Sequence, residues 1–221
     1  MIYVIMCGGQ YDHFGELPRP LHEIHGEPLV ARTIRQLEEC GVHAICISSN
    51  DPRFRQYGVV IRHENSYRAD GTQNYGYWLD AFYPYFPKYI KVTFLFGDVK
   101  YTDEAIAKIV EFARFSEHMR SMENVLFGSS LAKNPQHENW GEPFAYVVND
   151  YQTFMEGVQA VKKLQDEGKT KRIALVWELY RYLNGLDINV QQVLDETYIC
   201  IDDGTIDADD PWRFDEWNRN E

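Results

Sequence analysis

The feature that most constrains the fold is an alternation of short apolar strands with amphipathic helices in the first half of the chain. Residues 2–7 form an apolar, β-branched run, and a helical pattern follows that begins at Pro28 and ends before Gly41. Proline in the first helical turn and glycine just past the last turn are typical helix boundaries. Such alternation predicts an α/β fold, with a mostly parallel central sheet between two layers of helices.

The alternation continues along the chain, although the second half is less regular and is expected to add a small irregular lobe. We find no internal repeat or linker, so we expect one domain over residues 1–221. The remaining strands are predicted at 44–48, 59–61, 92–96, 125–128, 144–148 and 198–201, and the remaining helices at 71–82, 103–115, 150–167 and 173–184.

The net charge and the cysteine content limit the binding partners and the cellular compartment that we expect. The formal net charge of -12 argues against nucleic-acid and anionic-membrane binding. No apolar run reaches about 18 residues, so neither a signal peptide nor a membrane span is expected. The four cysteines form no CxxC pair, which favours reduced thiols in a cytoplasmic protein. The many aromatic residues can serve either the core or an interface, which leaves a homo-oligomer open.

The first strand ends in a turn suited to anions. Cys7, Gly8 and Gly9 follow the strand, and glycines allow backbone N–H groups to approach an anion with no Cβ in the way. Arg19 lies where the following loop would return, and it supplies a fixed cation. The pattern indicates a phosphate-bearing ligand. The alternative is an ordinary strand-to-helix turn with a solvated arginine.

Gly97 and Asp98 follow the strand predicted at 92–96. Asp98 is expected at the carboxyl edge of the sheet, where open α/β sheets bind ligands and where a carboxylate can hold Mg²⁺. In the tail, Asp207 and Asp209 would point to one face of an extended segment and could share a divalent cation with Asp98. The alternatives are that Asp98 caps a turn and that the acidic tail is solvated.

Apolar residues punctuate that tail. Ile201, Ile206 and Trp212 alternate with the acids, and we expect them to anchor the backbone, which a solvated tail does not need.

A second polar turn contains Trp140, Gly141 and Glu142, and its tryptophan is expected to face a ligand, although most large aromatics belong to the core.

These pieces, in this order, resemble the nucleotidyltransferase superfamily, which includes the sugar-phosphate nucleotidylyltransferases and the small cytidylyltransferases. Its members open with a strand, a glycine-rich loop, a Pro-Lys-Pro-Leu-like stretch and a Gly-x-Pro-Leu helix start. They then place an Asp after a central strand and an Asp-x-Asp-like element before a final helix. The matching segments here are Gly8-Gly9, Pro18-Arg19-Pro20-Leu21, Gly26-Glu27-Pro28-Leu29, Gly97-Asp98 and Asp207-Ala208-Asp209-Asp210-Pro211-Trp212.

The resemblance implies a three-layer, Rossmann-like (GT-A-like) sheet. It also implies Mg²⁺-dependent transfer of a nucleoside monophosphate from an NTP to a phosphorylated sugar or polyol, with release of pyrophosphate. The short chain slightly favours CTP. Arg19, Asp98 and Asp209 would be catalytic, and Asp98, Asp209 and Asp207 would hold Mg²⁺. The nucleotide would contact Cys7, Gly8, Gly9, Gln10, His13, Gly71 and Thr72, and the acceptor would contact Trp140, Gly141 and Glu142.

Two other functions fit parts of the pattern. A glycosyltransferase with a nucleotide-sugar donor would share the sheet, but it typically has Asp-x-Asp after the central strand, where this chain has Asp98-Val99-Lys100. A non-catalytic nucleotide-binding relative would account for the divergent loop, in which Tyr11 and His13 stand where the family prefers glycine and arginine.

Overall fold

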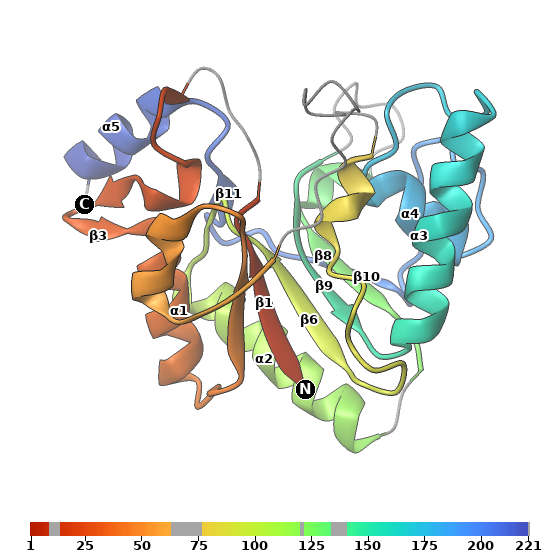
Figure 1. The fold of residues 1–221 in the computed structure, drawn as a ribbon, viewed down its shortest axis with the longest axis horizontal. Coiled ribbons are helices and arrows are strands. Elements are labelled where there is room, and N and C mark those ends of the chain that lie inside the picture. The colour runs from red at the N-terminus through yellow and green to blue at the C-terminus, as the bar shows by residue number, and fades with distance from the viewer. Residues whose placement is uncertain (9–13, 63–76, 120–121, 134–140, 221) are drawn as a thin grey trace.

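A seven-stranded sheet forms the centre of the molecule (Figure 1). The computed structural model describes residues 1–8, 14–62, 77–119, 122–133 and 141–220. From edge to edge the strands are β10 (Tyr198–Cys200), β8 (Val125–Gly128), β9 (Pro143–Val148), β6 (Val92–Phe96), β1 (Ile2–Met6), β4 (Ile45–Ser48) and β5 (Val59–Ile61). Strand β9 is antiparallel to β6 and β8, and the other pairings of this sheet are parallel. The predicted, mostly parallel sheet is confirmed.

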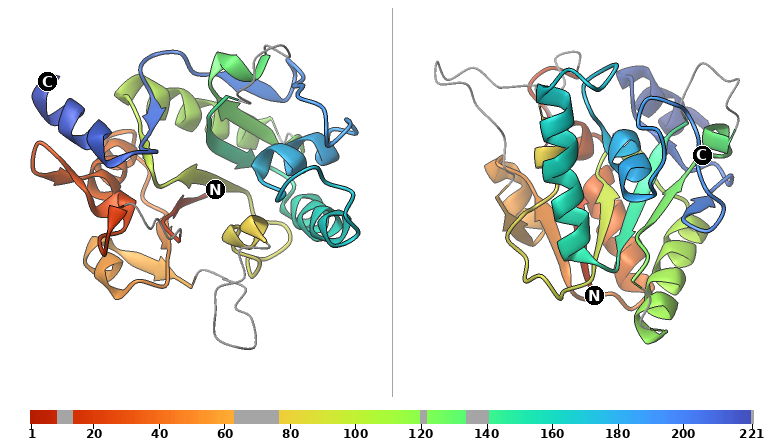
Figure 2. Two further views of the ribbon diagram at one scale, coloured as in Figure 1. Left: turned by 90° about the horizontal axis from the view of Figure 1, so that it is seen from above. Right: turned by 90° about the vertical axis from the view of Figure 1, so that its right-hand side faces the viewer.

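Helices cover both faces of the sheet, as predicted. Phe94 of β6 and Phe127 of β8 lie beside adjacent residues of β9, so their side chains point to opposite faces. Phe154 packs on Phe94 from one side, and Phe112 packs on Phe127 from the other. The view from above separates the two layers (Figure 2). The two layers consist of α1 (Leu29–Glu39) with α2 (Asp103–His118) and of α3 (Tyr151–Asp166) with α4 (Val176–Leu183).

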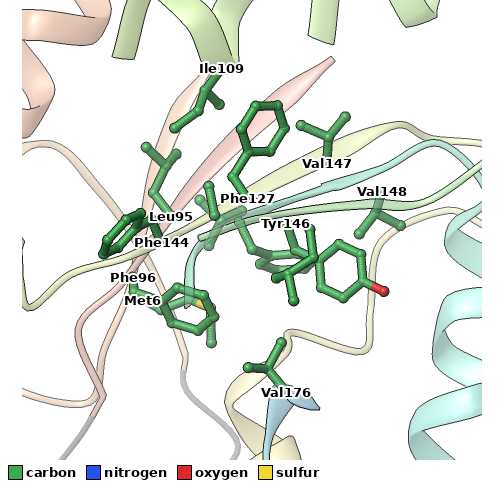
Figure 3. Close-up of a cluster of buried hydrophobic side chains, with 14 of the residues drawn as sticks. Met6, Leu95, Phe96, Ile109, Phe127, Phe144, Tyr146, Val147, Val148 and Val176 are labelled. Atoms are coloured by element: carbon green, nitrogen blue, oxygen red, sulfur yellow. The ribbon is translucent and has the colours of Figure 1, made fainter. Parts of the chain in front are cut away.

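Burial on both faces explains why the central strands are apolar throughout. All five residues of β6 are buried, as expected for a strand covered on both sides. In Figure 3, Ile109 of α2 lies near Leu95 and Phe127, whereas Val176 of α4 lies on the opposite side of the strands, below Tyr146. One main core extends in sequence from Tyr3 to Ile201.

The helix predicted at 71–82 is wrong in its described part. Residues 71–76 lie outside the described residues, so Gly71 and Thr72 are not placed. Tyr77 has an extended backbone (φ -132°, ψ 82°), and only the short 3₁₀ helix η4 (Trp78–Ala81) follows it. Pro84 disfavours a helical conformation at Tyr83, so the stretch between these two tyrosines is too short for a stable α-helix.

The other helices differ from prediction only at their ends. Helix α2 begins after Thr102, whose hydroxyl accepts a hydrogen bond from Ala105 N at 3.0 Å, and it continues to His118 rather than to Phe115. Helix α4 is shorter than the predicted 173–184. Leu175 is extended, and its N–H donates to Glu178 Oε2 at 2.9 Å, which fixes the start of the helix at the next residue.

The C-terminal helix packs beside the sheet against a hairpin from the first thirty residues. The hairpin of β2 (Glu23–Ile24) and β3 (Glu27–Pro28) lies next to α5 (Pro211–Asn220), as Figure 1 shows. Strand β11 (Ile206–Asp207) pairs with β7 (Val99–Lys100). None of the helices in the described part of the chain is both long and apolar enough to cross a bilayer. Among the described residues, further 3₁₀ helices are η2 (Arg19–Leu21), η3 (Pro52–Tyr57) and η5 (Ser130–Lys133).

Candidate functional site

The glycine turn and Asp98 lie together because β1 and β6 end side by side. Gly97 N donates to Met6 O at 3.0 Å. A Cβ on Gly97 would come within 2.5 Å of Met6 O and 2.7 Å of Cys7 Sγ, so only glycine allows this approach. Burial and the charge of Asp98 raise the pKa of the Cys7 thiol, which keeps it protonated. Asp98 therefore lies beside Cys7 and the start of the turn at Gly8.

Arg19 joins two of the predicted carboxylates. Its side chain is only 5% exposed. Nη1 donates to Asp98 Oδ2 at 3.1 Å and to Asp209 Oδ1 at 3.5 Å. The structure thus brings Arg19, Asp98 and Asp209 together from three distant parts of the sequence. Gly9, Gln10 and His13 lie outside the described residues.

The tail reaches Asp98 through backbone pairing. Asp207 of β11 is opposite Val99 of β7, and Ala208 N donates to Asp98 O at 2.8 Å. Asp207 and Asp209 flank the buried Ala208 and lie on one side of the extended segment, where their carboxylate oxygens come within 4.8 Å of each other. In Figure 1, β11 lies at the end of β1 that leads into the glycine turn.

The apolar anchors of the tail are partly different from those expected. Ile201 is buried and Ile206 is half-buried, as predicted. Trp212 is 52% exposed, so it does not anchor the tail by burial. The buried residues after Ala208 are instead Phe214 and Trp217. The difference arises because Pro211 starts helix α5, so burial follows helical spacing rather than alternation.

Glu142, expected at the acceptor, lies with the tail carboxylates. It offers a carboxylate oxygen within 4.8 Å of those of Asp207 and Asp209. Two hydrogen bonds to Ser129 hold its backbone: Ser129 N donates to Glu142 O at 2.8 Å, and Glu142 N donates to Ser129 Oγ at 2.9 Å. Gly141 has φ +77°, and a Cβ there would meet Ala132 N at 2.6 Å. Trp140 lies outside the described residues.

Negative charges outnumber positive ones among the side chains that meet here. Burial is the largest cause that raises the pKa of Asp207 to about 9, and the charges of Glu142, Asp209 and Asp98 add to it. Burial and the same neighbours raise the pKa of Glu142, while a hydrogen bond from Asp207 and the charge of Arg213 oppose the rise. Asp98, Glu142, Asp207 and Asp209, together with Arg19, are called the carboxylate site below. Burial and the repulsion between these negative charges therefore favour a protonated carboxyl in the site at neutral pH.

The donor set fits a hard divalent cation. Glu142, Asp207 and Asp209 provide only oxygen ligands, the type that Mg²⁺ prefers over the nitrogen and sulfur ligands typical of zinc. Opposite ligands of an Mg²⁺ octahedron are about 4.2 Å apart, which is compatible with oxygens within 4.8 Å of one another. A divalent cation here would also relieve the repulsion that raises the two pKa values.

Sequence reasoning missed the aromatic surroundings of Arg19. The guanidinium carbon lies 4.9 Å from the centroid of the Phe14 ring, and Phe14 contacts Phe214 of α5. No local pattern links residues so far apart in sequence. The sequence reasoning also missed the position of Glu142 beside the tail, which depends on its backbone hydrogen bonds to Ser129.

Comparison with known proteins gave two findings. A family model described as a MobA-like NTP transferase domain matches residues 3–118, about half of the chain. A solved structure from Bacillus anthracis, assigned as a glucose-1-phosphate thymidylyltransferase in complex with sucrose, is 13% identical with a TM-score of 0.60. That match covers 99% of this chain and 94% of the other. At this identity the likeness concerns the fold alone. No curated protein matches the chain.

Proposed function

The chain belongs to the MobA-like NTP transferase family, and on this premise we propose that it transfers a nucleoside monophosphate from an NTP to a phosphorylated sugar or polyol. One observation carries the proposal: Arg19 binds Asp98 and Asp209 at the edge of the sheet where the glycine turn begins. A buried cation beside clustered carboxylates provides charges of both signs, which a triphosphate and its metal ion require.

The reaction needs positioning and charge stabilisation more than it needs proton transfer. An oxygen of the acceptor phosphate attacks the α-phosphorus, and the bond from that phosphorus to the bridging oxygen of pyrophosphate breaks. The acceptor oxygen is already anionic, so no general base is required. Arg19 contacts phosphate oxygens in this proposal, and Cys7, Gly8, Gly9, Gln10, His13, Gly71 and Thr72 line the nucleotide.

Mg²⁺ is the proposed metal. Asp98, Asp209 and Asp207 would hold it, and Glu142 offers a further oxygen beside Asp207 and Asp209. When bound, the ion neutralises charge on the phosphates during transfer. The carboxylates provide the oxygen ligands, and Arg19 orients Asp98 and Asp209 through their shared contact with Nη1. Glu142 lies next to Asp207 and Asp209 and directly follows Gly141, so in this proposal it connects the metal region with the acceptor side.

A pyrophosphate-release assay tests the proposal. CTP is the first nucleotide to test, followed by UTP, dTTP, GTP and ATP, each with sugar 1-phosphates and polyol phosphates, with Mg²⁺ and with EDTA. We expect release from one NTP and one acceptor class, and only with the metal. Asp98→Ala should abolish it, and full turnover by this variant would contradict the metal assignment.

Two outcomes would point to other functions. Hydrolysis or transfer from a nucleotide sugar, with release of a nucleoside diphosphate, would indicate a glycosyltransferase. Thermal stabilisation by an NTP without turnover would indicate a binding protein. An NTP at a hundred times its Kd should stabilise the fold by about 2.7 kcal/mol, so the absence of any shift would contradict nucleotide binding.

A further inference from the structure

A second, small hydrophobic cluster lies beside the carboxylate site and is separate from the main core. Its buried members come from the first thirty residues and from the last fourteen of the chain: Phe14, Ile24, Leu29, Ala208, Phe214 and Trp217. This cluster, called the end cluster below, packs helix α5 against the segment that carries Arg19. Its position raises the question of what α5 contributes to the site.

Aromatic contacts connect α5 to Arg19 in one continuous chain. Trp217 packs on Phe214 with ring centroids 5.1 Å apart, and Phe214 meets Phe14 edge-on at 6.2 Å. Phe14 then faces the guanidinium of Arg19 at 4.9 Å. The ring of His22 fills the space beside them, 5.2 Å from Phe14 and 5.1 Å from Phe214.

The guanidinium of Arg19 is thereby held from two sides. Asp98 and Asp209 accept its hydrogen bonds on one side, and the face of Phe14 covers it on another. A guanidinium over an aromatic face is attracted to the ring, and most strongly at desolvated positions such as this one. The side chain is 5% exposed, so few other orientations are open to it while Phe14 stays in place.

Hydrogen bonds at the far end of α5 keep Phe214 in place. Asn218 Nδ2 donates to Glu23 O at 3.1 Å, and His25 N donates to Asn218 Oδ1 at 2.6 Å. His25 has a positive φ of 52°, an uncommon conformation for a residue other than glycine. These bonds attach α5 to the hairpin of β2 and β3, and they fix the distance between Phe214 and Phe14.

We infer that Phe14 and Phe214 are positioning residues for Arg19, and that helix α5 exists to hold this cation for the NTP. The inference rests on the proposed function. Neither phenylalanine touches the phosphates; they act through Arg19. Loss of the aromatic face should let the guanidinium reorient, which weakens binding of the triphosphate. Binding of the acceptor, which approaches from the side of Gly141, should not change.

Steady-state kinetics of Phe14→Leu test this inference. Leucine keeps an apolar side chain in the end cluster but removes the aromatic face. We expect KM for the NTP to rise about three- to tenfold, with KM for the acceptor unchanged. Phe14→Tyr retains the ring and should restore the wild-type KM. Phe214→Leu, one contact further from Arg19, should give a smaller rise in the same direction.

Phe112→Leu is the matched control. It removes a comparable edge-to-face contact, with Phe127 at 5.5 Å, on a helix away from the site. A purely structural loss lowers the amount of folded enzyme, and thus Vmax, without changing either KM. If Phe14→Leu behaves like Phe112→Leu, the inference is wrong while the proposed function stands. If the wild-type protein transfers no nucleotide at all, the proposed function and this inference both fail.

Discussion

The molecule contains two groups of charged side chains that are buried in different ways. The first, called the α4 cluster, consists of Arg172, Glu178 and Arg181. Glu178 Oε1 accepts from Arg172 Nε at 3.0 Å and from Arg181 Nη2 at 3.1 Å, and its other oxygen accepts from Leu175 N. Arg181 Nε donates to Ile188 O at 3.0 Å. These four hydrogen bonds join residues that are close in sequence, so the α4 cluster is local.

The carboxylate site differs from the α4 cluster in the sequence separation of its residues and in the balance of its charges. It joins residues from position 19 to position 209, and two of its four carboxyl groups, those of Asp98 and Asp209, share Arg19. In the α4 cluster the positive charges exceed the negative ones by one, and burial lowers the pKa of Arg181 only to about 10, so this arginine stays charged at neutral pH. In the carboxylate site, burial and the neighbouring carboxylates raise the pKa of Asp207 to about 9. A local, satisfied group indicates a structural role, and a long-range, unbalanced group indicates a ligand site.

Breaking the α4 cluster should have the largest effect. Glu178→Gln leaves Arg181, which is 1% exposed, without its carboxylate partner. Removal of one partner from a buried ion pair costs about 3–5 kcal/mol, so the free energy of unfolding should fall by that amount. Urea denaturation monitored by circular dichroism measures it, and activity per folded molecule should not change.

Glu111→Gln is the control for this change because Glu111 is exposed on α2. It should alter the unfolding free energy by less than about 0.5 kcal/mol. If Glu178→Gln lowers the free energy of unfolding by less than about 1 kcal/mol, the α4 cluster does not have the structural role assigned to it.

Breaking the carboxylate site should instead affect turnover. Asp209→Asn removes the charge that Arg19 and the proposed metal share, and we expect kcat to fall at least about a hundredfold, or about 2.7 kcal/mol. The unfolding free energy should change by less than about 1 kcal/mol, because Asp209 is more than half exposed. Asp215→Asn, at an exposed position on α5, should keep wild-type turnover. If the two variants had equal kcat values, the role proposed for Asp209 in turnover would be contradicted.

The two groups also differ in how far the sequence predicts them. Asp98 and Asp209 were expected together because a strand end and a tail motif fix where their backbones lie, and the structure places both on Arg19. The strands and most helices follow from apolar periodicity in the same way. The placement of Glu142 could not be predicted, because it depends on the bonds to Ser129 across a turn.

Other parts of the structure depend on contacts that leave no local pattern. Phe14 and Phe214 meet only because α5 lies against the hairpin, so neither is distinguishable from an ordinary core residue in the sequence. Trp212 shows the opposite error of prediction. The alternating pattern indicates burial, but Trp212 is exposed because the helix that starts at Pro211 turns it outward. Tertiary contacts outweigh local propensity in both cases.

The smallest expected effect separates repulsion from metal binding within the carboxylate site. Asp207→Asn keeps a group that donates to Glu142, but it removes the carboxylate whose pKa is raised by burial and by its neighbours. Without metal, the variant should be as stable as the wild type or more stable by up to about 1 kcal/mol, because the site no longer needs a proton to limit its charge. With saturating Mg²⁺ and NTP, the wild type should gain thermal stability and the variant should gain less, since one oxygen ligand is lost. A variant that is destabilised without metal, as Glu178→Gln is expected to be, would mean that Asp207 is a satisfied structural residue like those of the α4 cluster. The contrast between the two groups would then not identify a ligand site.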